Sequence, residues 1–409
     1  MSDCNDCFET EQKLLTVSAT LGLIADRFKV VTETEWIPLR DALDRVLAAD
    51  VISPMDLPPF DNSAMDGYAV RAGDLGRALP VAGPLFAGDG PVAAPPPGTA
   101  LRIFTGAPMP VGLDLVVMQE EAQVEGNHVR LPAGRRPGSN LRRKGEDVAT
   151  GQVALPAGRR LRPQDVALAA ALGVERLQVH RPLRVALFST GNELTEPGGA
   201  LPPGGIYDSN RALLRGLLSR MGCSVTDLGI LADEEGMIRA ALADAAGGHD
   251  LILTSGGVSA GEADHVKAAV MALGGLDLWK LALKPGKPFA LGHVGGTAFA
   301  GLPGNPVAML VGFLALARPL IHRLSGEIPA PLPLLTVPAG FAHAKKPGRR
   351  EYLRVSIGSD GKAMADPDDG AAMLGRLTQA DALAELSEDV TQVRPGDALR
   401  VLPLVMVGA

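Results

Sequence analysis

The sequence predicts a multidomain protein of α/β plus β class, organised around a doubly wound parallel-sheet domain over residues 183–326. With 409 residues the chain is longer than one hydrophobic core usually supports, so several domains are expected. From residue 183 onward, short apolar runs alternate with segments of helical periodicity, which is typical of a parallel sheet. Outside this region, short apolar runs separated by Gly and Pro turns indicate β domains.

Composition excludes several classes of function. The 39 Lys+Arg and 46 Asp+Glu residues give a net charge of −7 without a basic tract, which argues against nucleic acid as a partner. Cys4 and Cys7 have a CxxC spacing, but no second pair completes a zinc site, so we interpret them as a chance pair. The N-terminus lacks a signal-peptide pattern, and polar residues interrupt the apolar segment 307–324. We therefore expect a cytoplasmic protein without a membrane partner.

Two separate parts of the chain, residues 8–53 and 148–182, are predicted to contain helices. Apolar residues recur at helical spacing over residues 8–27, and further helices are expected over 39–47 and 163–172. These segments predict a discontinuous helical, dimerisation-type domain over residues 8–53 and 148–182.

The intervening residues 54–147 predict an inserted β domain. Its expected strands are residues 79–86, 99–104, 115–119 and 128–131. Residues 60–70 form a dense polar loop that a plain strand would not need. The basic and acidic stretch 140–147 is compatible with a solvated hairpin edge as well as with a site.

The parallel-sheet domain carries its polar residues at the ends of strands. Expected strands are 184–189, 225–231, 251–253 and 277–283, and expected helices include 209–222 and 265–273. A further helix is expected with Asp233 as its N-cap and with an apolar face of Met237, Ile238, Ala241 and Leu242. Ligands of such sheets bind beyond the carboxyl ends of the strands. Glu193, Asp233, Lys284 and Lys287 all follow such ends.

Residues 251–264 contain the strongest local signal for a ligand. A short strand ends in Ser255-Gly256-Gly257, where glycines allow main-chain N–H groups to approach an anion. Ser259 adds a hydroxyl, and Asp264 adds a carboxylate that is useful beside a phosphate when a cation bridges them. Taken alone, this loop is better explained as a plain strand-to-helix turn. Together with the other strand ends, and with Asn305-Pro306 starting a helix nearby, it favours a phosphate ligand and a divalent metal.

Eight motifs in order resemble the molybdopterin molybdenumtransferase family, which includes the C-terminal domain of gephyrin. They are DNSAMDGYA (61–69), TGAP (105–108), RRKGED (142–147), STGNEL (189–194), YDSN (207–210), SGGVSAGEAD (255–264), KPGKPFA (284–290) and GLPGNP (301–306). The resemblance covers nearly the whole chain. It implies insertion of molybdenum from molybdate into adenylyl-molybdopterin, with release of AMP and with Mg²⁺ as cofactor.

The resemblance also implies an architecture. The domain over 183–326 would be of the molybdopterin-binding type, and residues 329–409 would form a C-terminal β barrel. The family forms homodimers in which the inserted domain of one subunit faces the parallel-sheet domain of the other. A molybdopterin adenylyltransferase is a possible further partner.

The site residues that the resemblance implies fall into three groups. The family's catalytic positions match Asp66, Thr105, Asp147, Glu193, Asp233, Asp264, Pro303 and Pro306. As hypotheses, Ser255, Gly256, Gly257 and Ser259 hold the substrate phosphate, and Lys284, Lys287 and Arg349 hold molybdate. Glu193, Asp233 and Asp264 are the candidate Mg²⁺ ligands.

Two departures and two alternatives remain. Ala308 stands where many members have Ser, and Asn192 stands where Asp often precedes Glu193. The chain could instead be a molybdopterin adenylyltransferase, whose whole fold resembles residues 183–326, or a non-enzymatic scaffold. The residues leave molybdate and tungstate both open as the source of metal.

Overall fold

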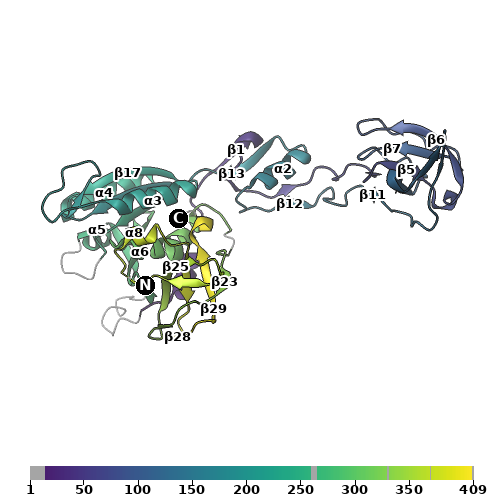
Figure 1. The fold of residues 1–409 in the computed structure, drawn as a ribbon. Helices are drawn as coiled ribbons and strands as arrows, with labels where there is room; N and C mark the ends of the chain where they lie inside the picture. The colour runs from purple at the N-terminus through teal and green to yellow at the C-terminus, as the bar shows by residue number, and fades with distance from the viewer. Residues whose placement is uncertain (1–13, 259–264, 329–330, 369, 408–409) are drawn as a thin grey trace.

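The computed structural model describes residues 14–258, 265–328, 331–368 and 370–407. Figure 1 shows a compact lobe that contains the C-terminus, a narrower middle layer, and a distal β domain at the end of an extended arm. The molecule is therefore elongated, and residues near positions 60–130 lie far from the lobe.

The sheet of the lobe has six strands. Its order is β17 (Ser224–Leu231), β14 (Arg184–Thr190), β18 (Leu251–Ser255), β22 (Thr297–Leu302), β21 (Pro288–Val294) and β19 (Gly274–Lys280). The first four strands are parallel, as predicted, whereas β21 and β19 pair antiparallel. The expected strand 277–283 is shifted, because β19 ends at Lys280 and β20 (Leu283–Lys284) joins another sheet.

Alternating residues along the central strands pack on opposite faces of this sheet. In β18, Leu251 and Leu253 face one core, which also contains helix α3 (Ser209–Arg220), whereas Ile252 faces the other. The second core contains α4 (Glu235–Gly248) and α5 (His265–Leu273). Both faces are buried, which explains the continuous apolar runs of these strands.

A long apolar helix crosses the first face. It comprises α6 (Pro306–Gly312), the π-helical η4 (Phe313–Ala317) and α7 (Arg318–Leu324). The segment is long and apolar enough to cross a membrane, but 83% of it is buried inside the lobe. Helix α1 (Val17–Arg27) packs on it, and Arg323 donates hydrogen bonds to the carbonyls of Ala25 and Phe28. Core burial therefore accounts for its hydropathy.

The middle layer is less helical than predicted. It contains α2 (Pro163–Ala171), a sheet of β1 (Thr34–Pro38), β13 (Arg176–His180) and β2 (Val46–Leu47), and the pair β3 (Val51–Ile52) and β12 (Val153–Leu155). The expected helix over 39–47 is wrong. Only a 3-10 turn, η1 (Leu39–Asp41), forms, because Asp44 has a φ of 61° and Val46 and Leu47 pair with β13.

The distal domain confirms the four predicted strands. Its sheet has the order β8 (Leu115–Met118), β5 (Gly67–Val70), β7 (Ala100–Ile103), β6 (Ala78–Leu85), β10 (His128–Arg130) and β9 (Gln123–Glu125). A Cβ on Gly67 would lie 2.0 Å from the carbonyl oxygen of Val117, so only glycine allows this strand pairing. The pair β4 (Asn62–Ser63) and β11 (Leu141–Arg142) lies on the arm side of the domain.

The C-terminal sheet packs against the lobe. Its antiparallel strands are β25 (Arg350–Ile357), β27 (Ala382–Leu386), β29 (Ala398–Pro403) and β23 (Leu335–Pro338). Strand β20 pairs with β25 and so attaches the loop at Lys284 to this sheet. A closed barrel stays a prediction.

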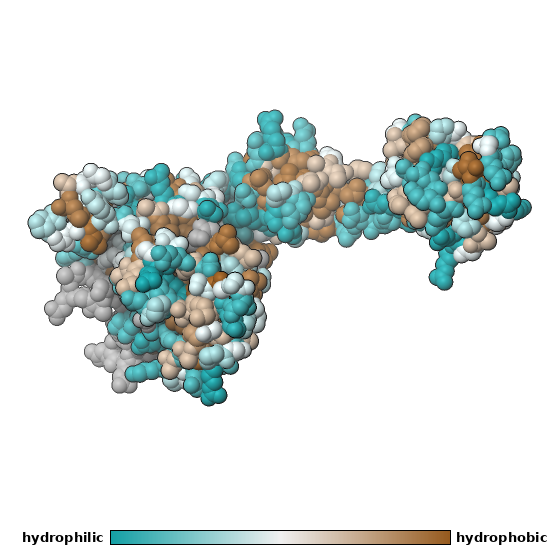
Figure 2. Space-filling model, viewed as in Figure 1, coloured by the Kyte–Doolittle hydropathy of each residue, from teal (hydrophilic) through white to brown (hydrophobic). Residues whose placement is uncertain are grey.

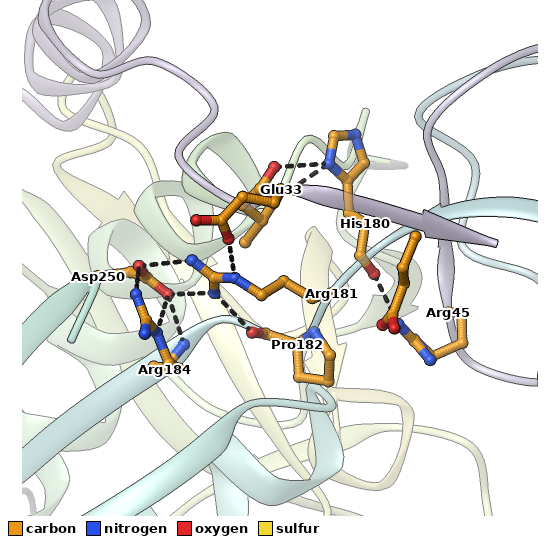
Figure 3. Close-up of polar contacts among 9 residues, drawn as sticks. Glu33, Arg45, His180, Arg181, Pro182, Arg184 and Asp250 are labelled. Atoms are coloured by element: carbon orange, nitrogen blue, oxygen red, sulfur yellow. Dashed lines mark hydrogen bonds and ion pairs between the residues drawn. The ribbon is translucent and has the colours of Figure 1, made fainter. Parts of the chain in front are cut away.

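The joint between the middle layer and the lobe is an ion-pair cluster, shown in Figure 3. Arg181, directly after β13, donates to Asp250 at 2.6 and 3.0 Å and also to Glu33. Arg184 donates to the same Asp250 carboxylate. Burial alone would raise the pKa of Asp250, but these hydrogen bonds outweigh it and lower the pKa to about 2. Asp250 is therefore ionised at neutral pH and holds both arginines.

A second ion-pair group crosses the same joint. Arg160, from the middle layer, donates to Glu327 at 2.6 and 3.0 Å, and His322 of α7 lies 2.7 Å from the same oxygen. The hydrogen bonds from His322 and Arg160 outweigh burial and lower the pKa of Glu327 to about 2. Largely buried ion pairs thus contribute to the attachment of the arm.

Candidate functional site

The Gly-Gly turn after β18 lies against the end of β14. Gly256 and Gly257 have φ values of +91° and +64°. A Cβ on Gly256 would lie 2.5 Å from the carbonyl oxygen of Thr190, and one on Gly257 would lie 2.4 Å from the side chain of Val266. Both positions therefore require glycine, for conformation and for space. Ser255, at the end of the strand, is 3% exposed.

The turn after β22 lies beside the Gly-Gly turn. The N–H of Gly256 donates to the carbonyl of Leu302 at 3.1 Å. Pro303 is buried, whereas Gly304 and Asn305 are exposed. Asn305 is the N-cap residue of α6, as predicted, although its side chain makes no capping hydrogen bond. Pro306 occupies the first turn of α6.

Asn210 connects the two turns, and sequence reasoning assigned it no role. Its amide nitrogen donates to the Ser255 hydroxyl at 2.9 Å and to the Gly304 carbonyl at 2.6 Å. The residue is 7% exposed and lies in the first turn of α3, after the N-cap Asp208. The available signal was an amide directly inside a helix start in the YDSN motif.

The two described carboxylates predicted to bind metal follow neighbouring strands. Glu193 is exposed after β14, and its carboxylate folds back over Gly191. Asp233 follows β17, is half-buried and accepts a hydrogen bond from the Thr190 hydroxyl at 3.4 Å. The prediction that Asp233 caps α4 is wrong, because Glu234 occupies the N-cap.

Two predicted site residues, Ser259 and Asp264, lie outside the described residues. Within the described ranges, no group of three or more His, Cys, Asp or Glu side chains could hold a metal ion. Metal binding at Glu193 and Asp233 therefore stays a prediction.

Lys284 is held by a carboxylate of the C-terminal sheet. Its ammonium lies 2.8 Å from Oε1 of Glu351, whose side chain is 4% exposed. Nε2 of His343 lies 3.3 Å from the same oxygen. Glu351 was not identified from the sequence, because its contact depends on the pairing of β20 with β25.

The other predicted oxyanion-binding residues are exposed near this lysine. Lys287 follows Lys284 in the same loop, and Arg349 precedes β25, with its carbonyl accepting from Lys345 at 2.8 Å. A Cβ on Gly286 would lie 3.1 Å from the carbonyl oxygen of Ala308, so the lysine loop touches α6. Ala308 is itself 4% exposed.

A separate group of predicted site residues lies on the arm. Asp66 accepts hydrogen bonds from the N–H and hydroxyl of Thr105 at 2.8 and 2.7 Å. These bonds, and then the charge of Arg102, lower the pKa of Asp66 below its ordinary value. Asp147 is exposed in the segment between β11 and β12.

Within one chain the predicted site is thus divided. The lobe brings together Glu193, Asp233, Ser255, Gly256, Gly257, Pro303 and Pro306, with Lys284 and Lys287 on the loop that touches α6. Asp66 and Thr105 lie together in the distal domain, which Figure 1 shows remote from the lobe.

Glycine turns beyond the carboxyl ends of a parallel sheet, with a lysine loop beside them, are typical of multidomain α/β enzymes. Three family models match in order: the MoeA N-terminal region (domain I and II) at residues 15–173, a probable molybdopterin binding domain at 186–323, and the MoeA C-terminal region (domain IV) at 336–404. The chain belongs to the molybdopterin molybdenumtransferase (MoeA) family, whose members act in molybdenum cofactor biosynthesis.

Named relatives and a solved structure agree with these models. A molybdopterin molybdenumtransferase of Haemophilus influenzae is 44% identical, over 77% of this chain and 78% of the relative. Molybdopterin molybdenumtransferase 2 of Mycobacterium tuberculosis H37Rv is 38% identical, over 90% and 94%. The molybdopterin biosynthesis MoeA protein of Pyrococcus horikoshii OT3 has a TM-score of 0.82 at 29% identity, covering 96% of this chain and 100% of that chain. The predicted family and multidomain fold class are confirmed.

Proposed function

We propose that this enzyme inserts molybdenum from molybdate into adenylylated molybdopterin and releases AMP in a Mg²⁺-dependent reaction. The observation that carries the proposal is the joining of two glycine turns, at Gly256 and Gly304, beyond the carboxyl ends of parallel strands. Relatives that match 77% and 90% of this chain are named molybdopterin molybdenumtransferases, which supports the proposal.

The phosphate groups of the substrate fit the turns. Main-chain N–H groups at strand ends and helix starts bind phosphate without side-chain charge. The Ser255 hydroxyl accepts from Asn210 and keeps its own proton to donate. These groups would orient the pyrophosphate bond without a covalent protein intermediate.

The oxyanion would bind at the lysine loop. Lys284, Lys287 and Arg349 are exposed cations at the contact between the lobe and the C-terminal sheet. Molybdate is a compact dianion, for which ammonium and guanidinium groups are suitable donors. Glu351 holds the ammonium of Lys284 in place while leaving the lysine 49% exposed.

We propose that the carboxylates near Thr190 bind the magnesium ion. Mg²⁺ in enzymes is commonly held by one or two carboxylates together with substrate phosphates. Glu193 and Asp233 supply oxygen ligands, and Asp264 is proposed as a third. When bound, the ion would neutralise charge on the phosphates, while the protein supplies position.

We further propose a homodimer that completes the site. The middle layer exposes large apolar side chains, among them Trp36 at 60% and the cross-strand partners Ile52 and Val153 at 49% and 44%. Figure 2 shows this apolar surface between the two ends of the molecule. Burying it against a second copy would remove the patch from water, and would let Asp66 and Asp147 approach the partner's lobe.

The proposed reaction is tested by AMP release. Purified enzyme, adenylylated molybdopterin, molybdate and Mg²⁺ should give AMP and active cofactor, and omission of molybdate should abolish cofactor formation. Consumption of ATP with unadenylylated molybdopterin would instead indicate an adenylyltransferase. Absence of both reactions would contradict the proposal and favour a scaffold.

A further inference from the structure

The YDSN motif contains one buried side chain that the proposed chemistry leaves without a role. Asp208 accepts a hydrogen bond from the N–H of Arg211 and so caps α3. Asn210 instead faces the two anion-binding turns, with donors to Ser255 and to Gly304. One side chain therefore spans two loops that are far apart in sequence.

The orientation of this amide is determined by its partners. The carbonyl of Gly304 can only accept, so the group at 2.6 Å from it must be the NH₂ of Asn210. The same NH₂ donates to Ser255, so both of its hydrogens are committed to the turns. Its Oδ1 is buried and has no hydrogen-bond partner among the described atoms. An aliphatic residue at position 210 would leave the buried hydroxyl of Ser255 without this hydrogen-bond donor.

The geometry points to Asn210 as a positioning residue for the reaction. We propose that its amide fixes the spacing between the Gly256 and Gly304 turns, and thereby sets the affinity for the phosphate-bearing substrate. A Cβ on Gly304 would lie 4.0 Å from the Cα of Gly256, so the turns are close enough to face one anion. The inference rests on the proposed function, since it assigns these turns to the substrate phosphates.

The variant Asn210→Asp tests the spacing of the two turns without changing the volume of the side chain. The carboxylate has nearly the shape of the amide. One of its oxygens would take the place of the amide nitrogen, which lies 2.6 Å from the carbonyl oxygen of Gly304. The hydroxyl of Ser255 can rotate and donate to it, so only the contact to Gly304 becomes repulsive. Protonation of the carboxyl group at lower pH would restore one donor.

The experiment measures KM and kcat for AMP release with adenylylated molybdopterin in wild type, Asn210→Asp and Asn210→Ala. Both variants should raise KM about tenfold with a smaller change in kcat, since loss of a buried hydrogen bond corresponds to about one factor of ten. The KM ratio of Asn210→Asp to wild type should fall as the pH is lowered, whereas that of Asn210→Ala should not.

Thr297→Val is the matched structural control. Thr297 is 7% exposed, and its hydroxyl donates to the carbonyls of Ala246 and His249 at the opposite end of β22. This variant removes a buried hydroxyl from β22, the strand that leads to the Gly304 turn, without changing either turn. Its Tm should fall while its KM stays at the wild-type value.

Two results would overturn the assignment. A wild-type KM in Asn210→Asp would show that the spacing of the two turns does not affect substrate affinity. An equal rise of KM in Thr297→Val would show that the rise in Asn210→Asp results from a general loss of stability. Amide hydrogen exchange at residues 255–258 and 304–305 provides a readout independent of catalysis, and should be faster in Asn210→Asp in both turns. Lack of AMP release by wild type would reject the proposed function, whereas unchanged exchange would reject the positioning role.

Discussion

Single hydrogen-bonded or ion-paired contacts orient the residues that are proposed to bind ligands. Glu351 pairs with Lys284, and Thr105 donates twice to Asp66, lowering the pKa of that carboxyl group. Asp66 is therefore ionised under all physiological conditions. These contacts hold the functional groups in one orientation before substrate arrives, which reduces the ordering cost of binding.

At Lys287, removal of the ammonium should weaken oxyanion binding. Lys287→Ala is expected to raise the molybdate concentration for half-maximal rate by about 10–100-fold, since a charge-assisted hydrogen bond contributes about 1.5–3 kcal/mol. The measurement is the rate of cofactor formation against molybdate. Lys362→Ala is the control, since Lys362 pairs with Asp360 in a hairpin of the C-terminal sheet. An unchanged molybdate dependence would remove Lys287 from the site.

At Asp233, a neutral isostere should reduce metal binding without affecting the fold. Asp233→Asn is expected to raise the Mg²⁺ concentration for half-maximal rate by about 10–100-fold, with an unchanged Tm. The side chain is half-buried at the rim and fills no core volume. Wild-type dependence on Mg²⁺ would exclude Asp233 as a ligand.

At the scale of elements, the strands were predictable and the contacts between loops were not. Apolar runs identified β14 and β18, and paired glycines identified the turn at Gly256. Asn210 donates hydrogen bonds to Ser255 and Gly304, which are 45 and 94 positions further along the chain, so no local pattern predicts these contacts. The wrong helix over 39–47 has the same cause, since pairing with β13 overrides a weak local preference.

The Gly-Gly turn should not tolerate a methyl group. Gly256→Ala is expected to cost about 1–3 kcal/mol of stability, because its φ is positive and the Cβ would meet the carbonyl of Thr190. The control is Gly216→Ala in α3, where a Cβ meets nothing within 4 Å and should stabilise by about 0.5–1 kcal/mol. Equal Tm changes in the two variants would contradict the strain argument.

At the scale of the molecule, buried ion pairs at the joint make stability depend on pH. The folded-state pKa values of Asp250 and Glu327 are about 2, below the ordinary values of 3.8 and 4.5. Their contribution is therefore complete above about pH 5 and is lost as the pH falls toward 2. For Asp250 alone it amounts to about 2 kcal/mol.

Asp250→Asn should flatten this dependence. The variant is expected to have a lower Tm at pH 6 and a smaller further fall between pH 5 and pH 3 than wild type, because one titrating group is gone. Calorimetric scans at several pH values measure both quantities. Parallel curves for variant and wild type would contradict the assigned role of Asp250.

A shared site predicts complementation between inactive chains. Mixed Asp66→Ala and Asp233→Ala chains should recover about a quarter of wild-type activity, since half of the dimers are mixed and each has one intact site. Native mass spectrometry would verify that mixed dimers form. Mixed dimers without activity would show that each chain forms its own site.

The way the arm is attached has a mechanical consequence. Arg181 and Arg160 attach the arm at one end, through Asp250 and Glu327 of the lobe, and the distal domain is at the other end. Because the arm is long and is attached at one end, a small rotation at the joint would move the distal domain by a large distance. If the tip of each subunit closes over the lobe of its neighbour, the ion pairs of these two guanidinium groups contribute to setting the distance between tip and lobe.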